Sequence, residues 1–212
     1  MAGPLDAVKA IHNAFRTDMN GIDSAAYRAA QGHGDLSAVV ERYRFFNEIL
    51  DWHAHGEEIS MFPALEGVAP LVAEAYEKDH RGLDALFASL SGAISSKSAL
   101  DTARVTAAFK FHLDIHLDKE DAHLYRIIGQ RVAMPEQGRL VGIMANEVPQ
   151  DRFPELVEWM FPLMGDDDRE NMTRIWRMVM PEPAFAGAKE LIQKAIPDGW
   201  NELSRRIPEL TA

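Results

Sequence analysis

The sequence of 212 residues contains no cysteine. This absence excludes disulfides, thiolate metal sites and cysteine nucleophiles, and it leaves histidine and carboxylate side chains as the strong metal ligands. Runs of lysine or arginine are also missing, and 22 basic against 33 acidic residues give a net charge of −11. Because a nucleic-acid backbone would be repelled by such a chain, we do not expect nucleic acid as a partner.

Long apolar runs are missing as well. No stretch approaches the roughly 20 apolar residues that a membrane-spanning helix needs, so the sequence predicts no membrane partner and a cytoplasmic location. A hydrophobic content of 47% is nevertheless enough to build a proper core. The length suits one substantial domain, or one domain with an appended piece.

The third absence is the alternation of apolar and polar residues that is typical of strands. Apolar residues instead recur at spacings of three and four, which predicts helix almost throughout. Breaks at "NGID", Pro63 with Gly67, "SSKS" and Gly129 separate predicted helices over about 5–19, 36–62, 70–95 and 99–128. Asp35 and Ser98 are the expected caps of the second and fourth helices. We therefore predict an all-α fold, an antiparallel four-helix bundle over residues 1–130.

Beyond Gln130 frequent prolines predict short additional C-terminal helices, so residues 131–212 form a helical extension that packs on or beside the bundle. Five large apolar residues there fit either a core or a surface for an apolar ligand, a protein partner or a homodimer. Helical spacing favours the core. They are Trp159, Phe161, Met164, Trp176 and Met180.

A repeated pattern carries the chemistry. "HAHGEEISMFPAL" from His53 and "HLDKEDAHLYRII" from His116 share the form H-x-x-x-E-[ED]-x-x-[ML]-[FY]. Four residues advance a helix by about 6 Å and 400°, so His53 shares a face with Glu57, and His116 with Glu120. Met61 and Phe62 continue the first face toward the core with apolar groups, and Leu124 and Tyr125 continue the second. Ionisable groups in an apolar core are costly unless they are paired or bound to a cation, so the repeat indicates a metal site.

Two further histidines lie on apolar faces of the other predicted helices, His12 near Val8 and Phe15 and His80 near Leu83. Four helices that point histidine inward, two of them with glutamate, are typical of a dinuclear carboxylate site. This many nitrogen and oxygen ligands without sulfur favours iron, then manganese, over a structural zinc. Ordinary buried histidines would leave the repeat unexplained.

At these residues the sequence resembles the hemerythrin-like, or HHE cation-binding, family. The match comprises His12, "HAHGEE", "KDH" with His80, and "HLDIHLDKED", in family order over roughly residues 5–130. The resemblance implies two iron ions bridged by Glu57 and Glu120 with an oxo or hydroxo group as third bridge, and histidines at the ends.

One residue departs from the family pattern. Oxygen-carrying hemerythrins have a histidine pair on the third helix, and Tyr76 stands here in place of its first member. His112, one turn before His116, restores the count of five histidines, so it is expected as a ligand or near neighbour, unless it is an ordinary core or boundary histidine. Tyr76 either lies beside the metals, as a hydrogen-bond donor or ligand, or is a packing residue.

The remaining polar candidates are secondary. Glu58 and Asp121 turn about 100° away from the bridging positions, which favours solvation or salt bridges over a role as acceptors for ligand N–H groups. His123 either orients Glu120 or is exposed, and the exposed interpretation is favoured. His55 and His33 are expected at the surface.

The sequence contains no phosphate-binding loop, catalytic triad or nucleotide fingerprint, so a small substrate is expected. The first hypothesis is a diiron protein that binds or turns over dioxygen, nitric oxide or hydrogen peroxide, including catalase-like or gas-consuming activity. Tyr76 and an apolar wall would control access. The second is an iron- or oxygen-sensing module that signals through the C-terminal helices, and the third a scaffold that lost its metal. The wall is predicted from Phe15, Phe46, Leu50, Leu83 and Ile115.

Overall fold

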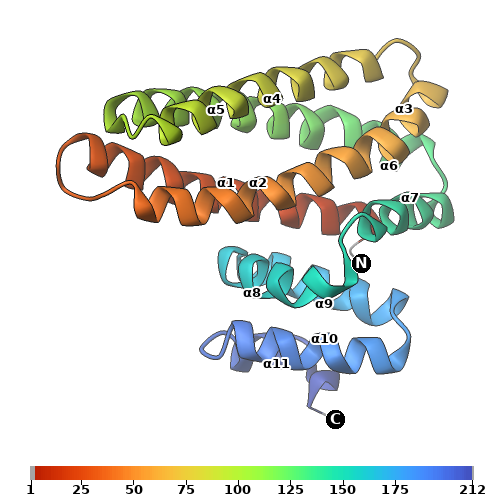
Figure 1. Ribbon diagram of the computed structural model, residues 1–212. Helices are drawn as coiled ribbons and strands as arrows, with labels where there is room; N and C mark the ends of the chain where they lie inside the picture. Colours follow the sequence, from red (N-terminus) through yellow and green to blue (C-terminus); the bar gives the residue numbers. More distant parts are fainter. Residues whose placement is uncertain (1–2, 212) are drawn as a thin grey trace.

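The computed structural model describes residues 3–211, and all regular elements in this range are helical. Four long helices run up and down in an antiparallel bundle, shown in the upper part of Figure 1. They are α1 (Pro4–Ala30), α2 (Ser37–Gly56), α4 (Ala73–Ser95) and α5 (Ala99–Lys119). The predicted all-α bundle is confirmed.

Helix α1 is longer than predicted, because it does not end at "NGID" but continues through Gly21 to Ala30. The residues after the expected stop still present a buried face, which includes Ile22 and Ala26. Arg42 of α2 also lies against Gly21 and donates to Asp18. Tertiary packing therefore overrides the local helix-breaking tendency of an Asn-Gly pair.

The second and fourth bundle helices each contain a π-helical segment. Helix α2 continues through Glu57–Met61 into α3 (Phe62–Val68), and α5 continues through Glu120–Leu124 into α6 (Tyr125–Arg131). Both segments begin at the glutamate of the repeated motif. Single π turns inside α-helices occur frequently at functional sites. Pro63, which lacks an N–H, is the second residue after the first segment and does not end the helix.

Of the two predicted caps, Ser98 is confirmed, because it accepts a hydrogen bond from the backbone N–H of Asp101. The cap position of α2 is Leu36 and not Asp35, although Asp35 accepts a hydrogen bond from the N–H of Ser37 just before the helix. Helix α4 begins at Ala73 rather than near Pro70. The cause is Leu71, whose φ of 70° lies in the left-handed region and cannot continue a helix.

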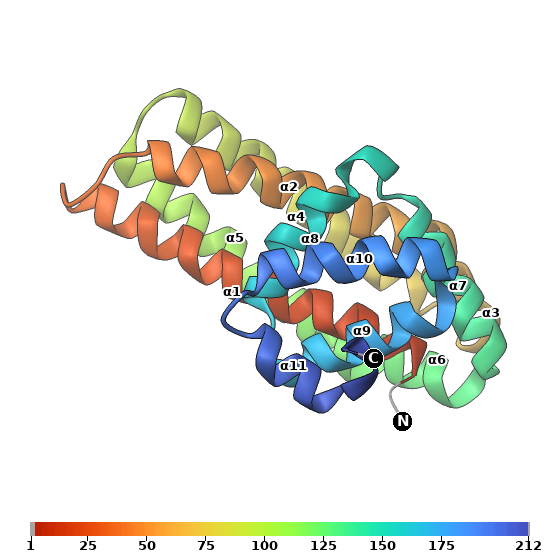
Figure 2. The ribbon, with the colours of Figure 1, turned by 90° about the horizontal axis from the view of Figure 1, so that it is seen from below.

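The predicted C-terminal helices are present as an extension that packs beneath α1 (Figures 1 and 2). Helix α7 lies across the end of the bundle, and the others form the lower part of the molecule. The elements are α7 (Met134–Asn146), α8 (Phe153–Leu163), α9 (Asp166–Val179), α10 (Glu182–Ala195) and α11 (Trp200–Arg206), with 3₁₀ turns at Gln150–Arg152 and Pro208–Leu210.

Helix α1 is buried on two faces. One face contributes to the bundle, and the other places Ala7, Ala10 and Ala14 against α8 and α9. Small side chains let helices approach closely, so the extension shares its core with the bundle. Phe161 and Met164 belong to this shared core, and Trp159 and Trp176 pack against it. The interpretation of these four residues as core residues therefore agrees with their packing.

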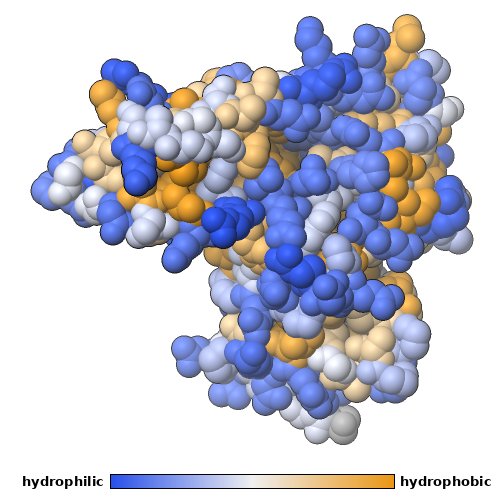
Figure 3. Space-filling view, in the orientation of Figure 1, coloured by the Kyte–Doolittle hydropathy of each residue, from blue (hydrophilic) through white to orange (hydrophobic). Residues whose placement is uncertain are grey.

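Two apolar clusters fill the bundle and leave a polar layer between them. Phe15, Phe46 and Leu113 belong to one cluster, and Val8 and Leu124 to the other. The polar layer comprises the histidines and glutamates singled out by the motif. The face seen in Figure 3 is largely hydrophilic, with apolar residues in separate patches. No helix within residues 3–211 has the length and hydropathy that a membrane crossing requires.

Candidate metal centre

Six of the predicted ligands meet in the polar layer. Each bundle helix contributes one histidine, and the two repeated motifs add one glutamate each. Their ligand atoms form two overlapping groups, and within each group all atoms lie within 4.8 Å of one another. The first group is His12, His53, Glu57 and Glu120, and the second is Glu57, His80, His116 and Glu120. Both carboxylates belong to both groups, as expected of bridging residues.

The metal-facing atoms of the histidines come in close pairs. The Nε2 atoms of His12 and His53 lie 3.0 Å apart, and those of His80 and His116 lie 3.1 Å apart. Two imidazole nitrogens at this distance share either a proton or a cation. All six side chains are buried. The set of nitrogen and oxygen donors, without sulfur, fits iron or manganese.

The outer ring nitrogens of two histidines are held by carboxylates. His12 Nδ1 donates to Asp121 Oδ1 at 2.9 Å, and His80 Nδ1 donates to Glu58 Oε1 at 2.8 Å. Because an ionised carboxylate only accepts, the proton resides on Nδ1 and the Nε2 lone pair faces the cluster. Glu58 and Asp121 thus orient the histidines, which was the less favoured prediction. Asp121 also pairs with Arg16 at 2.8 Å.

Several buried polar atoms in the cluster lack partners. Within the described chain, both oxygens of Glu120, Oε2 of Glu57 and Nδ1 of His116 make no hydrogen bond. An orphaned buried polar atom is costly, and a buried carboxylate more so. A cation bound between the carboxylates would satisfy these oxygens. The residues present therefore fit a bound metal pair.

The two glutamates differ electrostatically. Burial raises the pKa of Glu120 well above its ordinary value, and the nearby Glu57 carboxylate raises it further. For Glu57, burial acts in the same direction, but His53, His80 and His12 outweigh it and hold the pKa well below the ordinary value. Burial and His80 lower the pKa of His116 to about 3, so this ring is neutral. Of the two carboxyl groups, Glu57 is therefore the more readily ionised and Glu120 the more readily protonated.

A tyrosine that sequence reasoning treated as packing contacts the cluster. The Tyr125 hydroxyl donates to Glu57 Oε1, whereas Phe62, at the equivalent position of the other repeat, has no hydroxyl to offer Glu120. Comparison of these two positions could have identified Tyr125. The predicted tyrosine, Tyr76, is buried, but its hydroxyl donates to the Lys119 carbonyl at 3.3 Å. The structure places Tyr125, not the Tyr76 hydroxyl, on a candidate ligand.

His112 does not join the cluster. Its side chain is exposed, and its Nδ1 donates to the Ala108 carbonyl at 2.9 Å. Four residues advance a helix by about 400°, so His112 is rotated about 40° from His116, toward solvent. Ile115, predicted in the apolar wall, is 45% exposed. Both residues were predicted on the buried face of α5, but they lie at its exposed side, and the structure corrects the two predictions.

The remaining histidines lie at the surface. His33, His55 and His123 are exposed. His55 Nε2 lies 3.5 Å from Glu147 Oε2 of α7, and the two side chains form a partly exposed pair. These placements agree with the favoured interpretation of each residue.

A small cavity reaches the cluster from the side of α2 and α4. Its volume is about 260 Å³, and His53, Glu57, His80 and His116 line its inner end. The rest of the lining is mostly apolar and includes Leu50, Leu83, Phe87, Phe109 and Leu117. Two residues of the predicted wall, Leu50 and Leu83, thus lie on this route, while Phe15 and Phe46 are buried in the adjacent core.

Comparison with known proteins agrees with this geometry. The hemerythrin HHE cation-binding domain matches residues 3–128, which is more than half of the chain. The chain belongs to this family. The matched range begins just before α1 and ends in α6, so the HHE domain corresponds to the bundle and includes all six clustered residues.

Curated relatives match the chain over a longer range. Zinc finger protein BRUTUS of Arabidopsis thaliana is 25% identical over 192 residues, which cover 87% of this chain and 15% of that protein. Two BRUTUS-like zinc finger proteins of the same plant are 18% and 20% identical, and each covers 86% of this chain. The chain spans less than a fifth of the length of these relatives. No solved structure gives a significant match.

The similarity extends beyond the HHE domain. A match over 87% of the chain must include most of the C-terminal extension, because the family match ends at residue 128. The zinc finger in the relatives' names is not what is shared, since zinc fingers use cysteine ligands and this chain has none.

Proposed function

We propose that the clustered residues hold two iron ions and that this HHE domain binds or turns over a small oxidant or diatomic: dioxygen, nitric oxide or hydrogen peroxide. One observation carries the proposal, namely two overlapping groups of buried ligand atoms that share Glu57 and Glu120. Two histidines complete each group. Manganese fits the same donors less well by the usual preference of such sites.

Bound iron would supply the redox chemistry, which is electron exchange with the small ligand. The chain supplies ligand orientation and a dry environment. Asp121 and Glu58 fix the rings of His12 and His80 with Nε2 toward the cluster. Tyr125 donates to Oε1 of Glu57, so its hydroxyl restrains one of the two oxygens of that carboxylate.

The size of the lateral cavity supports a small substrate. At about 260 Å³ it lies below the roughly 300–1,000 Å³ of typical small-molecule pockets. Its apolar walls admit dioxygen, nitric oxide or peroxide and disfavour charged metabolites. Asp51 and Asp84 also line it and add negative charge, so anions are disfavoured further.

Iron content and an optical spectrum test the proposal directly. We expect about two iron atoms per chain, and an absorption spectrum of the aerobically purified protein that changes on addition of azide, peroxide or nitric oxide. Consumption of peroxide or nitric oxide by the iron-loaded protein would identify an enzyme. A protein that takes up no iron under reconstitution would refute the proposal and favour a bundle that lost its metal.

Three alanine variants test the assignment of residues. Glu57→Ala and Glu120→Ala each remove a carboxylate shared by both groups, so iron should fall from about two atoms per chain toward none. His55→Ala is the control, because His55 is exposed and lies two residues from His53 on α2. Equal iron retention in all three variants would contradict the bridging assignment.

A second candidate function, iron- or oxygen-dependent signalling, is favoured by a chain of contacts. Asp168 of α9 accepts from Asn13 at 2.9 Å, and Asn13 accepts from Arg16 at 3.3 Å. Arg16 in turn holds Asp121, which orients His12. The extension is thereby linked to a candidate ligand through side chains on α1, and it can offer a surface to a protein partner or a second copy.

Hydrogen exchange measured with and without iron tests this second function. Iron should slow exchange in α9, and Asn13→Ala should reduce that effect because it breaks the only link between Asp168 and Arg16 in the described contacts. Sedimentation under the same two conditions would detect iron-dependent self-association. If iron alters exchange in the bundle alone and the sedimentation is unchanged, the signalling function is refuted and the diiron site stands.

A further inference from the structure

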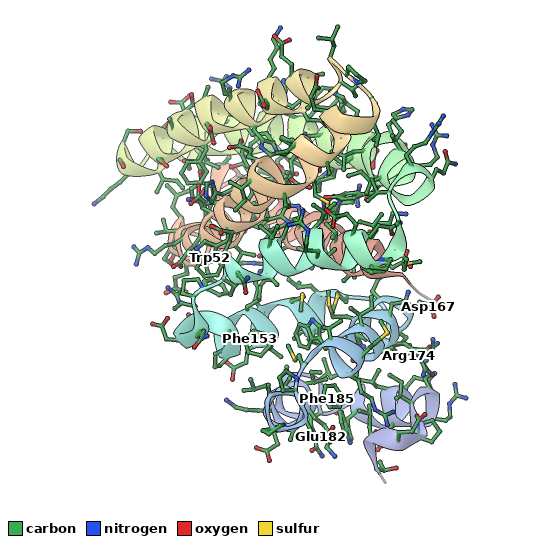
Figure 4. The ribbon with its side chains drawn as sticks, turned by 90° about the vertical axis from the view of Figure 1, so that its right-hand side faces the viewer. Trp52, Phe153, Asp167, Arg174, Glu182 and Phe185 are labelled. Carbon is green, nitrogen blue, oxygen red and sulfur yellow. The ribbon has the colours of Figure 1, made fainter. Side chains whose placement is uncertain are left out.

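A second, larger cavity lies between the bundle and the extension. Its volume is about 1020 Å³, and α1, α2 and α7 line one side while α8, α9 and α10 line the other. In Figure 4, Trp52 of α2 and Phe153 of α8 mark the two sides. Protein interiors are close-packed with few voids larger than a water molecule. This space is instead partly open to solvent, so it is a cleft between two packed layers and not a gap within one core.

The lining suits a flexible or aromatic apolar molecule. Trp52, Phe153 and Trp176 provide aromatic surface. Four methionines surround them, and this side chain adapts to irregular shapes because it is unbranched and polarizable. They are Met144, Met160, Met172 and Met180.

Helix α10 keeps the cavity open. Ala184, Gly187 and Ala188 share its cavity face at helical spacing. A Cβ built at Gly187 meets no atom of the described chain within 4 Å. A larger side chain at Gly187 would therefore enter this space without a clash at its Cβ.

The charges of the lining balance. The lining contains two formally charged residues, Glu190 and Lys194, which have opposite signs and lie one turn apart on α10. Lys194 additionally pairs with Glu158 outside the cavity. Because no net charge faces the space, an ion would lose its hydration without compensation, whereas an uncharged molecule would not.

One buried polar side chain in the lining lacks a partner. His53 is 8% exposed and lines both the large cavity and the lateral cavity. Its Nε2 faces the cluster, but its Nδ1 makes no hydrogen bond to residues 3–211, in contrast to Nδ1 of His12 and His80. Because His12 Nε2 offers a lone pair, His53 Nε2 carries the shared proton in the metal-free chain; with a cation on His53 Nε2 instead, Nδ1 holds the proton and can donate.

We propose that this cavity binds an uncharged, mostly apolar organic molecule whose carbonyl-type oxygen accepts a hydrogen bond from His53 Nδ1. The cavity volume is at the upper end of the roughly 300–1,000 Å³ of pockets for drug-sized ligands. The site differs from the lateral route for small oxidants; the cavity is present without iron, and the hydrogen bond from His53 rests on the proposed metal at its Nε2.

Nile red, an uncharged fluorescent molecule with a ring carbonyl, is a suitable probe for titration of the full chain. Binding should saturate at one molecule per chain. Gly187→Leu should weaken it at least tenfold, because the new side chain fills the cavity. Gly92→Leu is the matched control, since its Cβ on α4 likewise meets no described atom within 4 Å and lies outside the lining.

Circular dichroism verifies that both variants are folded, and Ala184→Leu replaces Gly187→Leu if the latter is not. Binding that does not saturate, or that is equal in the wild type and the folded cavity variant, would overturn the proposal. The measured signal is the fluorescence of the probe, so probe binding can also be measured on a chain that fails to load iron. Failure of this proposal and failure of the diiron function are thus distinguishable.

Fluorenone and fluorene test the hydrogen bond, because they share one skeleton and differ in the carbonyl oxygen. From the iron-loaded protein, fluorenone should displace Nile red at a concentration several-fold lower than fluorene, although fluorene is the more hydrophobic of the two. Equal displacement, or stronger displacement by fluorene, would overturn the role of His53 in recognition.

Discussion

Replacement of Tyr125 by phenylalanine removes a single hydroxyl group from the cluster. The ring is kept, and the equivalent position of the other repeat already holds a phenylalanine, Phe62, so no steric change is expected. Burial and the Glu57 carboxylate hold the pKa of Tyr125 well above its ordinary value, and the pKa of Glu57 is low. The hydroxyl is therefore a donor, and Glu57 is an ionised acceptor.

The magnitude follows from this charge state. A hydrogen bond to a charged group contributes about 1.5–3 kcal/mol, and the loss leaves Glu57 with a second unpaired oxygen. We expect Tyr125→Phe to lower the free energy of unfolding of the metal-free protein by that amount. For a chain of this size each kcal/mol corresponds to about 2–4 °C in Tm. Iron affinity should also fall about 10–100-fold, as for other residues that orient ligands.

Urea unfolding of the metal-free protein measures the effect, with Tyr76→Phe as the matched control. Tyr76 is equally buried, but its hydroxyl donates to a neutral backbone carbonyl at 3.3 Å. A neutral bond contributes about 0.5–1.5 kcal/mol. If Tyr76→Phe proves as costly as Tyr125→Phe, or if Tyr125→Phe leaves stability unchanged, the hydrogen bond to Glu57 does not have the assigned role.

Three further predictions concern the fourth helix, helix contact and metal removal. His112→Ala should retain iron, whereas His116→Ala should lose it, and iron analysis of both would contradict the placement of His112 if the losses are equal. Gly56→Ala should destabilise the fold by about 1–3 kcal/mol, because its Cβ would lie 3.0 Å from the Met144 Cα. Gly92→Ala, whose Cβ meets no described atom within 4 Å, should instead stabilise the fold by about 0.5–1 kcal/mol. Similar shifts of Tm in the two variants would refute the contact between Gly56 and Met144. Chelation of iron should lower stability by about 4 kcal/mol when free iron had been about 1,000-fold above Kd, and an unchanged Tm would argue against a native metal pair.

The two π segments show which features of the repeated motif are set by local spacing and which are set by tertiary packing. The repeated motif places His53 and Glu57 on one face, and four-residue spacing alone predicts this. It does not predict that the backbone widens at Glu57 and Glu120, because a π turn gives up regular hydrogen bonds and is stable only with support from surrounding packing. The widened turns shift every following residue, including Tyr125, relative to an ideal helix.

Gly56 is a second case. The sequence shows a glycine before Glu57 and a lysine, Lys119, before Glu120, with no local reason for the difference. The reason is the close approach of α7, because a Cβ at Gly56 would lie only 3.0 Å from the Met144 Cα. A contact between residues so distant in the chain depends on how α7 folds back, which local pattern does not encode.

Interactions between residues close in the sequence determined the helical content of this protein and the inward direction of its motif residues. The absence of cysteine, the three- and four-residue apolar spacing and the cap at Ser98 determined an all-helical chain with nitrogen and oxygen ligands. The His/Glu repeat determined which side chains face inward, since spacing along a helix sets direction. These features depend on residues within a few turns of one another.

Tertiary structure decided what depends on contacts between elements. It extended α1 past Gly21 through packing of Ile22 and Ala26 in the bundle core, turned His112 outward, and put the Tyr125 hydroxyl on Glu57. It also created the large cavity, because α7 and α10 come to line the same space only after the extension folds back onto α1. Burial and partners of a side chain arise from the whole fold, so no helical pattern could have specified them.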